Sequence, residues 1–236
     1  MTGRLEGRIA LVTGASRGIG RAVALRFAEE GATVAAMART QGALEELDDA
    51  IRKATGQGAM LIPESLTDFD KIDQVAQGLY QRFGKLDILV GAAAALGQLS
   101  PMGHYKPKMW TDVFDLNVHA NWRLLRSMDG LLQQSIAGRA IFVTSKVASE
   151  ARMYWGPYAA SKAALEQMVK TYAAEMAHTT VRANLIDPGA VRTKMRAAAY
   201  PGEDPMTLKT PEEITGAFVD LAAADFTKTG EVFKAQ

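Results

Sequence analysis

Short, wholly apolar runs alternate along this chain with longer segments in which apolar residues recur at helical spacing. The apolar runs have the length of buried strands, and we expect strands at residues 9–12, 33–37, 59–62, 86–90, 140–143, 181–186 and 231–233. The segments between them predict helices at residues 21–30, 44–54, 68–83, 107–134, 157–178 and 212–224. Apolar strands that alternate with helices are typical of a parallel sheet buried on both faces. The expected fold class is α/β, with a doubly wound parallel sheet of about seven strands.

Length and composition narrow the class of protein. With 236 residues, 48% of them hydrophobic, the chain fits one domain over residues 1–236. A net charge of +1 indicates neither a nucleic-acid groove nor a membrane partner. The absence of cysteine excludes disulfides and thiolate nucleophiles, and the three histidines lack metal-ligand spacing, so we expect no metal site. Without an apolar leader or an apolar run of about 18 residues, we expect a cytoplasmic protein.

The first expected strand runs into a glycine-rich turn at residues 13–20, and a helix follows directly. This arrangement is typical of dinucleotide binding, because the start of the helix supplies N–H groups for phosphates. Gly14 permits the tight turn, Gly18 lets the backbone approach a pyrophosphate, and Gly20 lets helix and strand pack closely. The other candidate contacts in the turn are Ser16, Arg17 and Ile19. The spacing is Gly-x3-Gly-x-Gly, so an ordinary glycine-rich connection is the alternative.

The end of the second expected strand indicates which dinucleotide would bind. An acidic residue at this position binds the ribose 2′-hydroxyl of NAD, but no Asp or Glu occurs between Gly31 and Leu44. Arg39 stands there instead, and Arg17 lies in the glycine turn. Two guanidinium groups suit a 2′-phosphate. The pattern therefore favours NADP(H) over NAD(H), unless both arginines are merely solvated.

Tyr158 and Lys162 lie four residues apart in an expected helix and so share one face. A cation beside a phenol lowers the phenol's pKa, which would make Tyr158 a proton donor and acceptor. The same spacing occurs by chance on many amphipathic helices. The loops that follow parallel strands meet at one edge of the sheet, so the glycine turn, Arg39 and Ser145 are expected near Tyr158.

Five motifs in this order and spacing resemble the short-chain dehydrogenase/reductase family, in its compact single-domain branch. They are Thr-Gly-x3-Gly-Ile-Gly at 13–20, Leu-Asn-Val at 116–118, Ser145 after the fifth expected strand, Tyr158-x3-Lys162, and Asn184-x3-Pro188-Gly189 followed by Thr193. The resemblance covers nearly the whole chain and implies a Rossmann fold. It also implies an oxidoreductase that interconverts a carbonyl and a secondary alcohol, with a small-molecule substrate and NADP(H) as cofactor.

The resemblance implies a role for each of four residues. Tyr158 would be the general acid in carbonyl reduction and the base in alcohol oxidation. Ser145 would hydrogen-bond the substrate oxygen. Lys162 would bind the nicotinamide ribose and lower the pKa of Tyr158, and Asn117 would hold a water that links Lys162 to solvent.

Further cofactor contacts are implied in the loops after the strands. They are Thr40, Ser65, Leu66, Ala92, Ala93, Asn117, Tyr158, Lys162, Pro188, Gly189, Val191 and Thr193. Two positions depart from the family pattern. Gly91-Ala92-Ala93-Ala94 replaces the usual Asn-Asn-Ala-Gly and puts local rigidity in doubt, and Ser65 stands where an Asp usually meets the adenine. Thr13 is expected to bond the backbone near the fourth strand.

Residues 193–209 correspond to the family's variable substrate lid, and with Trp155-Gly156-Pro157 they are similar to a bacterial subgroup whose substrates are poorly assigned. Possible apolar pocket residues are Met153, Tyr154, Trp155, Met195 and Tyr200. Lys146, Arg152, Lys194 and Arg196 either favour an anionic substrate or are simply solvated.

The resemblance also implies a homodimer or homotetramer, formed through the two long expected helices. The alternative function is a catalytically silent sensor or scaffold that binds NADP, with residues 91–94 as its only support. Another reaction on the same scaffold, such as dehydration or enoyl reduction, is disfavoured by the chain length and the Tyr-x3-Lys spacing.

Overall fold

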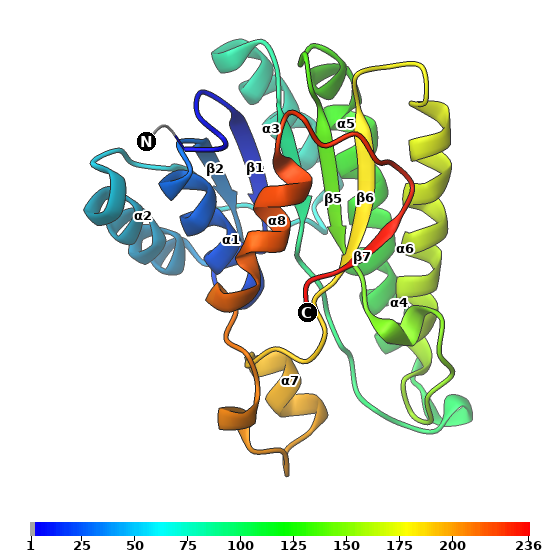
Figure 1. The fold of residues 1–236 in the computed structure, drawn as a ribbon. Helices are drawn as coiled ribbons and strands as arrows, with labels where there is room; N and C mark the ends of the chain where they lie inside the picture. The colour runs from blue at the N-terminus through cyan, green and yellow to red at the C-terminus, as the bar shows by residue number, and fades with distance from the viewer. Residues whose placement is uncertain (1–2) are drawn as a thin grey trace.

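The computed structural model, which describes residues 3–236, is built on one seven-stranded parallel sheet (Figure 1). The strand order is β3-β2-β1-β4-β5-β6-β7, as expected for a doubly wound α/β fold. The strands are β1 (Ile9–Thr13), β2 (Thr33–Met37), β3 (Met60–Ile62), β4 (Ile88–Gly91), β5 (Arg139–Val143), β6 (Arg182–Asp187) and β7 (Val232–Lys234). All seven strands expected from the apolar runs are therefore present.

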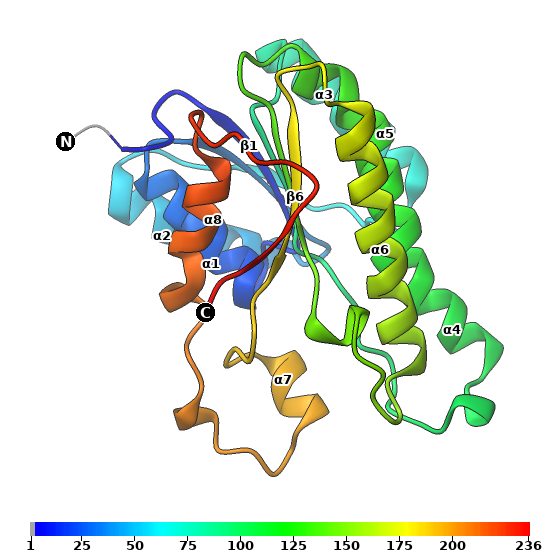
Figure 2. The ribbon, with the colours of Figure 1, turned by 45° about the vertical axis from the view of Figure 1, so that its right-hand side comes forward.

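Helices cover both faces of the sheet (Figure 2). The helices of one face are α1 (Gly18–Glu29), α2 (Gln41–Thr55) and α8 (Thr215–Ala222). The helices of the other are α3 (Phe69–Phe83), α5 (Ala120–Gln133) and α6 (Gly156–Glu175). Alternate side chains of β1 point to opposite faces, so Val12 packs with Phe27 of α1 while Leu11 belongs to the core under α5. Burial on both faces explains why the strand is apolar at every position.

The sheet order reverses beside β1, because β2 pairs with one of its edges and β4 with the other. The chain turns into α1 immediately after this strand. In open parallel sheets, ligands bind beyond the carboxyl ends of the strands at such a reversal. The topology therefore brings the loops after β1, β2, β4, β5 and β6 to one edge.

The helix expected at residues 107–134 is interrupted in the structure. It consists of α4 (Pro107–Phe114), a π-helical turn at Asp115–His119, and α5. The apolar periodicity runs through the break, so the pattern did not predict it. A π-turn adds one residue to a helical turn and often occurs at a functional site, and this one contains Asn117.

The lid expected after β6 is a loop that extends beyond the strand ends, at the bottom of both views (Figures 1 and 2). It contains α7 (Lys194–Ala199) and a 3-10 turn at Pro205–Thr207. Val191 and Lys209 pair as a parallel bridge, and the N–H of Arg192 donates to the carbonyl of Lys209 at 2.8 Å. The two ends of the lid, at Val191 and Lys209, are thus held next to each other. None of the helices described over residues 3–236 is long and apolar enough to cross a membrane.

Candidate active site

Tyr158 and Lys162 lie in the first turns of α6, close to the end of β5. Both are buried, with 7% and 2% of their surfaces exposed. The Lys162 ammonium donates to the carbonyl of Val143, the last residue of β5, at 2.7 Å, and lies 5.7 Å from the centre of the Tyr158 ring. Ser145 is the second residue after β5, and it lies close enough to Tyr158 to lower the pKa of the phenol. The structure therefore brings together three of the four expected catalytic side chains.

Burial decides the protonation states of this pair. Desolvation raises the pKa of Tyr158 to about 12, with the Ser145 hydrogen bond lowering it and Asp187 raising it. Desolvation also lowers the pKa of Lys162 to about 8, and Glu166 raises it in part. Burial therefore decides the net shift of the Tyr158 pKa, and the lowering expected from Lys162 stays a prediction. At neutral pH Tyr158 is a neutral phenol and so a proton donor.

We expect Lys162 to make stability rise with pH. Its pKa falls from the ordinary 10.5 to about 8 on folding, so the unfolded chain binds more protons between these values. The cost of the buried charge is fully present below about pH 8 and is lost as pH rises to 10.5. Urea unfolding of wild type and Lys162→Met at pH 7, 8, 9 and 10 measures this. The free energy of unfolding of the wild type should rise relative to that of the variant from about pH 8 upward. A constant difference would contradict a depressed pKa.

Asn117 reaches the same site from the π-helical turn. Its side-chain carbonyl accepts from the N–H of Ala95 at 2.8 Å, and its amide donates to the carbonyl of Ala95 at 3.0 Å and to the Ser161 hydroxyl at 2.9 Å. Ser161 in turn donates to the carbonyl of Tyr158 at 2.8 Å. The Asn117 side chain thus joins the loop after β4 to α6.

Asn121 is a further residue at this site that the sequence analysis missed. It is 2% exposed, and its amide donates to the main-chain carbonyl of Asn117 at 2.8 Å. A polar residue on the buried face of α5, one helical turn after Asn117, was the available signal. A carbonyl has two lone pairs, so Asn117 can still hold the expected water on the second, which stays a prediction.

The departure at Gly91 is compensated by packing. A β-carbon there would lie 2.3 Å from the Phe142 ring and 2.8 Å from the Asn121 amide oxygen, so both side chains fill the space. Thr13 bonds the backbone near β4, as expected: its hydroxyl donates to Val90 at 3.1 Å and accepts from the N–H of Ala92 at 3.2 Å. The strand end is therefore held without the family's asparagine.

The glycine turn after β1 has the shape of a phosphate cradle. Gly14 and Gly18 have φ angles of 68° and 55°, which side chains rarely adopt. A β-carbon at Gly14 would come within 2.9 Å of the Ala93 backbone, and one at Gly20 within 2.4 Å of the Gly14 carbonyl. Helix α1 begins at Gly18 without a side-chain cap or an acidic residue in its first turn. Its N–H groups are thus available to an anion, and the residues present fit a pyrophosphate.

The other expected cofactor residues differ in what they can offer. Arg17 and Arg39 are exposed, and neither has a carboxylate partner within residues 3–236. The Ser65 hydroxyl bonds Thr67 at 2.9 Å, while the Leu66 side chain is buried in the core and leaves only its backbone for a ligand. The smaller contacts lie as follows: Ser16, Ile19, Ala92 and Ala93 are half-buried in the two loops, and Thr40 is exposed at the start of α2.

The loop after β6 leads into the lid and contacts the glycine turn. Thr193 caps α7 by accepting from the N–H of Arg196 at 3.1 Å, which leaves its hydroxyl hydrogen free to donate. Its methyl group lies 3.5 Å from the β-carbon that Gly18 lacks, so lid and glycine turn meet. Val191 is buried beneath this loop, as is Pro188, and Gly189 is exposed.

Gln236 is a second residue that sequence reasoning missed. Its side-chain amide donates to the carbonyls of Pro188 at 2.7 Å and Ala190 at 3.1 Å. A β-carbon on Gly189, with its φ of 70°, would lie 2.5 Å from that amide. Gln236 therefore holds the loop after β6 in place. The contact joins residues that are distant in the sequence, so no local pattern predicts it.

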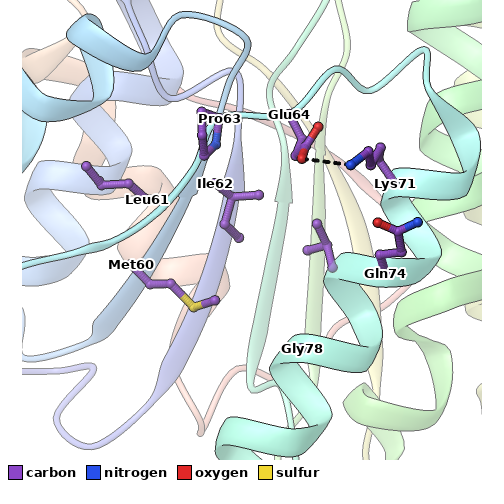
Figure 3. Close-up of a pocket in the computed structure, with 9 residues that line it drawn as sticks. Met60, Leu61, Ile62, Pro63, Glu64, Lys71, Gln74 and Gly78 are labelled. Carbon is purple, nitrogen blue, oxygen red and sulfur yellow. Dashed lines mark ion pairs between the residues drawn. The ribbon is translucent and has the colours of Figure 1, made fainter.

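A separate pocket of about 250 Å³ lies between β3 and α3, at the edge of the sheet (Figure 3). Glu64 and Lys71 face each other across it at 3.3 Å. The residues that line it are Met60, Leu61, Ile62, Pro63, Glu64, Lys71, Gln74, Val75 and Gly78. None of the expected catalytic or cofactor residues is among them, so this pocket is not the site described above.

Comparison with known proteins adds independent findings. The family model described as short chain dehydrogenase matches residues 8–204. YciK, an uncharacterized oxidoreductase of Escherichia coli K12, is 40% identical over 98% of this chain and 93% of its own. A 3-oxoacyl-(acyl-carrier-protein) reductase of Thermotoga maritima is 33% identical over 89% of this chain and 80% of its own. The structure of a short chain dehydrogenase from Shigella flexneri, complexed with NADP, is 38% identical, covers 100% of both chains and has a TM-score of 0.97.

Proposed function

This chain belongs to the short chain dehydrogenase family, and on that premise we propose an NADP(H)-dependent oxidoreductase that interconverts a carbonyl and a secondary alcohol. The observation that carries the proposal is the meeting of Tyr158, Ser145 and Lys162 at the strand edge that also holds the glycine cradle. A phenol, a hydroxyl and an ammonium converge there beside a phosphate site.

The residues of the site divide the work of the reaction. The nicotinamide supplies the hydride chemistry when it is bound. Tyr158, neutral because it is buried, holds a proton at its hydroxyl for the substrate oxygen in reduction, and its phenolate takes one in oxidation. Ser145 stabilises the charge that develops on that oxygen. Lys162, fixed by its bond to Val143, orients the ribose and can resupply the proton.

The preference for NADP rests on charge. Arg17 lies in the glycine turn after β1 and Arg39 in the loop after β2, both exposed, and no carboxylate pairs with either within residues 3–236. No acidic residue stands at the end of β2 to receive a ribose hydroxyl. The NADP complex of the Shigella flexneri relative supports the same assignment.

We expect Arg39→Asp to reverse the cofactor preference. The ratio of NADPH affinity to NADH affinity should fall by about 100-fold, because a charge-assisted bond to the 2′-phosphate is replaced by repulsion. Cofactor fluorescence titrations measure both affinities. Lys53→Asp, an exposed charge reversal in the last turn of α2, is the matched control and should leave the ratio unchanged. An unchanged ratio in Arg39→Asp would sink the assignment of the 2′-phosphate.

A homodimer or homotetramer is part of the proposal. Trp122 of α5 is 47% exposed although it is a large apolar side chain, and α5 packs beside α6 in the outer layer of the fold. Such a surface suits contact with a second copy. The alternative of a silent sensor or scaffold has residues 91–94 as its only support, and the packing of Phe142 and Asn121 around Gly91 favours the enzyme.

A further inference from the structure

A row of aromatic rings leads from the catalytic tyrosine to the lid. The rings of Tyr158 and Trp155 are 5.7 Å apart and cross at 66°. The Trp155 ring in turn lies 5.8 Å from the ring of Tyr200, the residue that follows α7. The row presents flat, apolar surface beside the reacting group, on the two segments that face each other across the strand ends (Figure 2).

Arg152 places a positive charge at the far end of this row. Its guanidinium lies 5.7 Å from the centre of the Trp155 ring and donates to the Tyr200 hydroxyl. The side chain is exposed, and no carboxylate pairs with it within residues 3–236. Arg152 is therefore a cation without a carboxylate partner within residues 3–236. It is separated from Tyr158 by the Trp155 ring.

The other cations near the lid are accounted for differently. Arg196 makes two bonds of 2.6 Å to the Glu203 carboxylate, and Lys146 pairs with Glu150 at 2.8 Å. Lys194 is exposed at the first position of α7. Of the four cations that the sequence offered for an anionic substrate, only Arg152 is both unneutralised and fixed against the aromatic row.

The segment that carries Arg152 and Trp155 is held in a strained conformation. Tyr154, between them, has a φ of 74°, and it is the one non-glycine residue with a positive φ within residues 3–236. Its carbonyl accepts from the Tyr105 hydroxyl at 2.5 Å and from the N–H of Ser100 at 3.1 Å. Strain of this kind persists only where the surroundings impose it, and it clusters at ligand sites. The loop after β4 thus fixes the segment that carries Arg152 and Trp155 through these two bonds.

We propose that the substrate of this site is a carbonyl compound, or its alcohol, that carries a carboxylate on a flat apolar body, and that Arg152 selects it. The inference rests on the proposed function and specifies its substrate class. The apolar body lies along Trp155, the reacting carbon reaches Tyr158, and the carboxylate takes the planar fork of Arg152. One open guanidinium matches one negative charge, which favours a carboxylate over a phosphate.

The test compares two ketones of equal shape, 4-acetylbenzoate and 4-acetylbenzamide, by NADPH oxidation. For wild type, kcat/KM should favour the acid by about 10- to 100-fold, the value of a charge-assisted hydrogen bond. Arg152→Gln should abolish this preference, with the larger change in KM for the acid. Arg82→Gln is the matched control, because Arg82 also lies over a ring, 5.4 Å from the centre of Phe83, but on α3; it should behave as wild type.

Two additions keep the outcomes distinct. Tyr200→Phe keeps the ring and removes the hydroxyl that orients Arg152, so it should reduce the preference for the acid without removing it. Titration of unreactive benzoate and benzamide, followed by tryptophan fluorescence, needs no turnover. Tighter binding of benzoate that Arg152→Gln removes would support the inference even if neither ketone reacted, a result that counts against the proposed reaction alone. Equal binding of the two in wild type, or a preference that survives Arg152→Gln, would overturn the inference.

Discussion

Replacing Tyr158 with phenylalanine is expected to lower turnover by about 1,000-fold, the usual worth of a general acid–base group. The substitution removes one hydroxyl and keeps the ring that packs edge-on against Trp155 at 5.7 Å. The phenol that would pass a proton to the substrate oxygen is then missing, although Ser145 and Lys162 remain in place. NADPH affinity should change little, because the phosphate cradle lies on β1 and α1. Stopped-flow or steady-state NADPH oxidation measures the first quantity and fluorescence titration the second.

A second buried tyrosine on the same helix provides the control. The Tyr172 hydroxyl, on α6, donates to the Asp129 carboxylate at 2.7 Å. Tyr172 lies well beyond Lys162 along the same helix. Tyr172→Phe should cost stability, about 1 kcal/mol for the lost hydrogen bond, and leave turnover at the wild-type level. Wild-type turnover in Tyr158→Phe with any working substrate would show the acid–base assignment to be wrong.

Gly91→Ala is expected to destabilise the fold by about 3 kcal/mol, near the upper end for an added methyl group in a packed core. The new β-carbon would lie 2.3 Å from one atom of the Phe142 ring and 2.6 Å from another. Phe142 is fully buried on β5, next to Gly91 in the sheet register, so its ring has no free direction in which to move. Urea unfolding should show a lower midpoint with an unchanged slope.

Two further variants separate packing from a general effect of alanine. Gly91→Ala combined with Phe142→Val should be less destabilised than the sum of its single variants, because the smaller side chain vacates the space that the β-carbon needs. Gly78→Ala, in α3, has nothing within 4 Å of its β-carbon and should be neutral or stabilising. If Gly91→Ala unfolded at the wild-type urea concentration, the compensation described at this strand end would not exist.

The sequence predicted the sheet well because strand burial leaves a local record. Residues such as Leu11 and Val12 face opposite cores, so every position of a central strand must be apolar, and the run is visible without the fold. Element ends were less certain. Strand β4 includes Gly91, which looked like loop, because the strand partners Thr13 and Phe142 extend the ladder to it.

The π-helical turn at Asp115–His119 could not be predicted from the spacing of apolar residues. Apolar residues continue at helical spacing from α4 into α5, and one extra residue in a turn hardly disturbs that spacing. The turn is set by bonds from Asn117 to Ala95 and Ser161, which lie 22 and 44 residues away along the chain. Its carbonyl is held by Asn121. Contacts of this range exist only after the sheet has formed.

Protonation and charge balance at the site also depended on the fold. The spacing of Tyr158 and Lys162 suggested a phenol with a lowered pKa, whereas burial raises it to about 12. The lid cations looked alike in sequence, but Glu203 neutralises Arg196 while Arg152 remains open. Desolvation and ion pairing depend on three-dimensional neighbours, so residue types alone cannot rank such groups.

By itself the sequence determined the order of strands and helices, the glycine turn, and the identities of Ser145, Tyr158 and Lys162, because each depends on local periodicity or on a short motif. The tertiary structure alone decided the π-turn at Asn117, the packing around Gly91, and the open charge of Arg152 beside Trp155. These features arise where segments distant in the chain meet at the strand ends. Burial and contact there set the protonation of Tyr158 and Lys162 and the charge that is left open at Arg152.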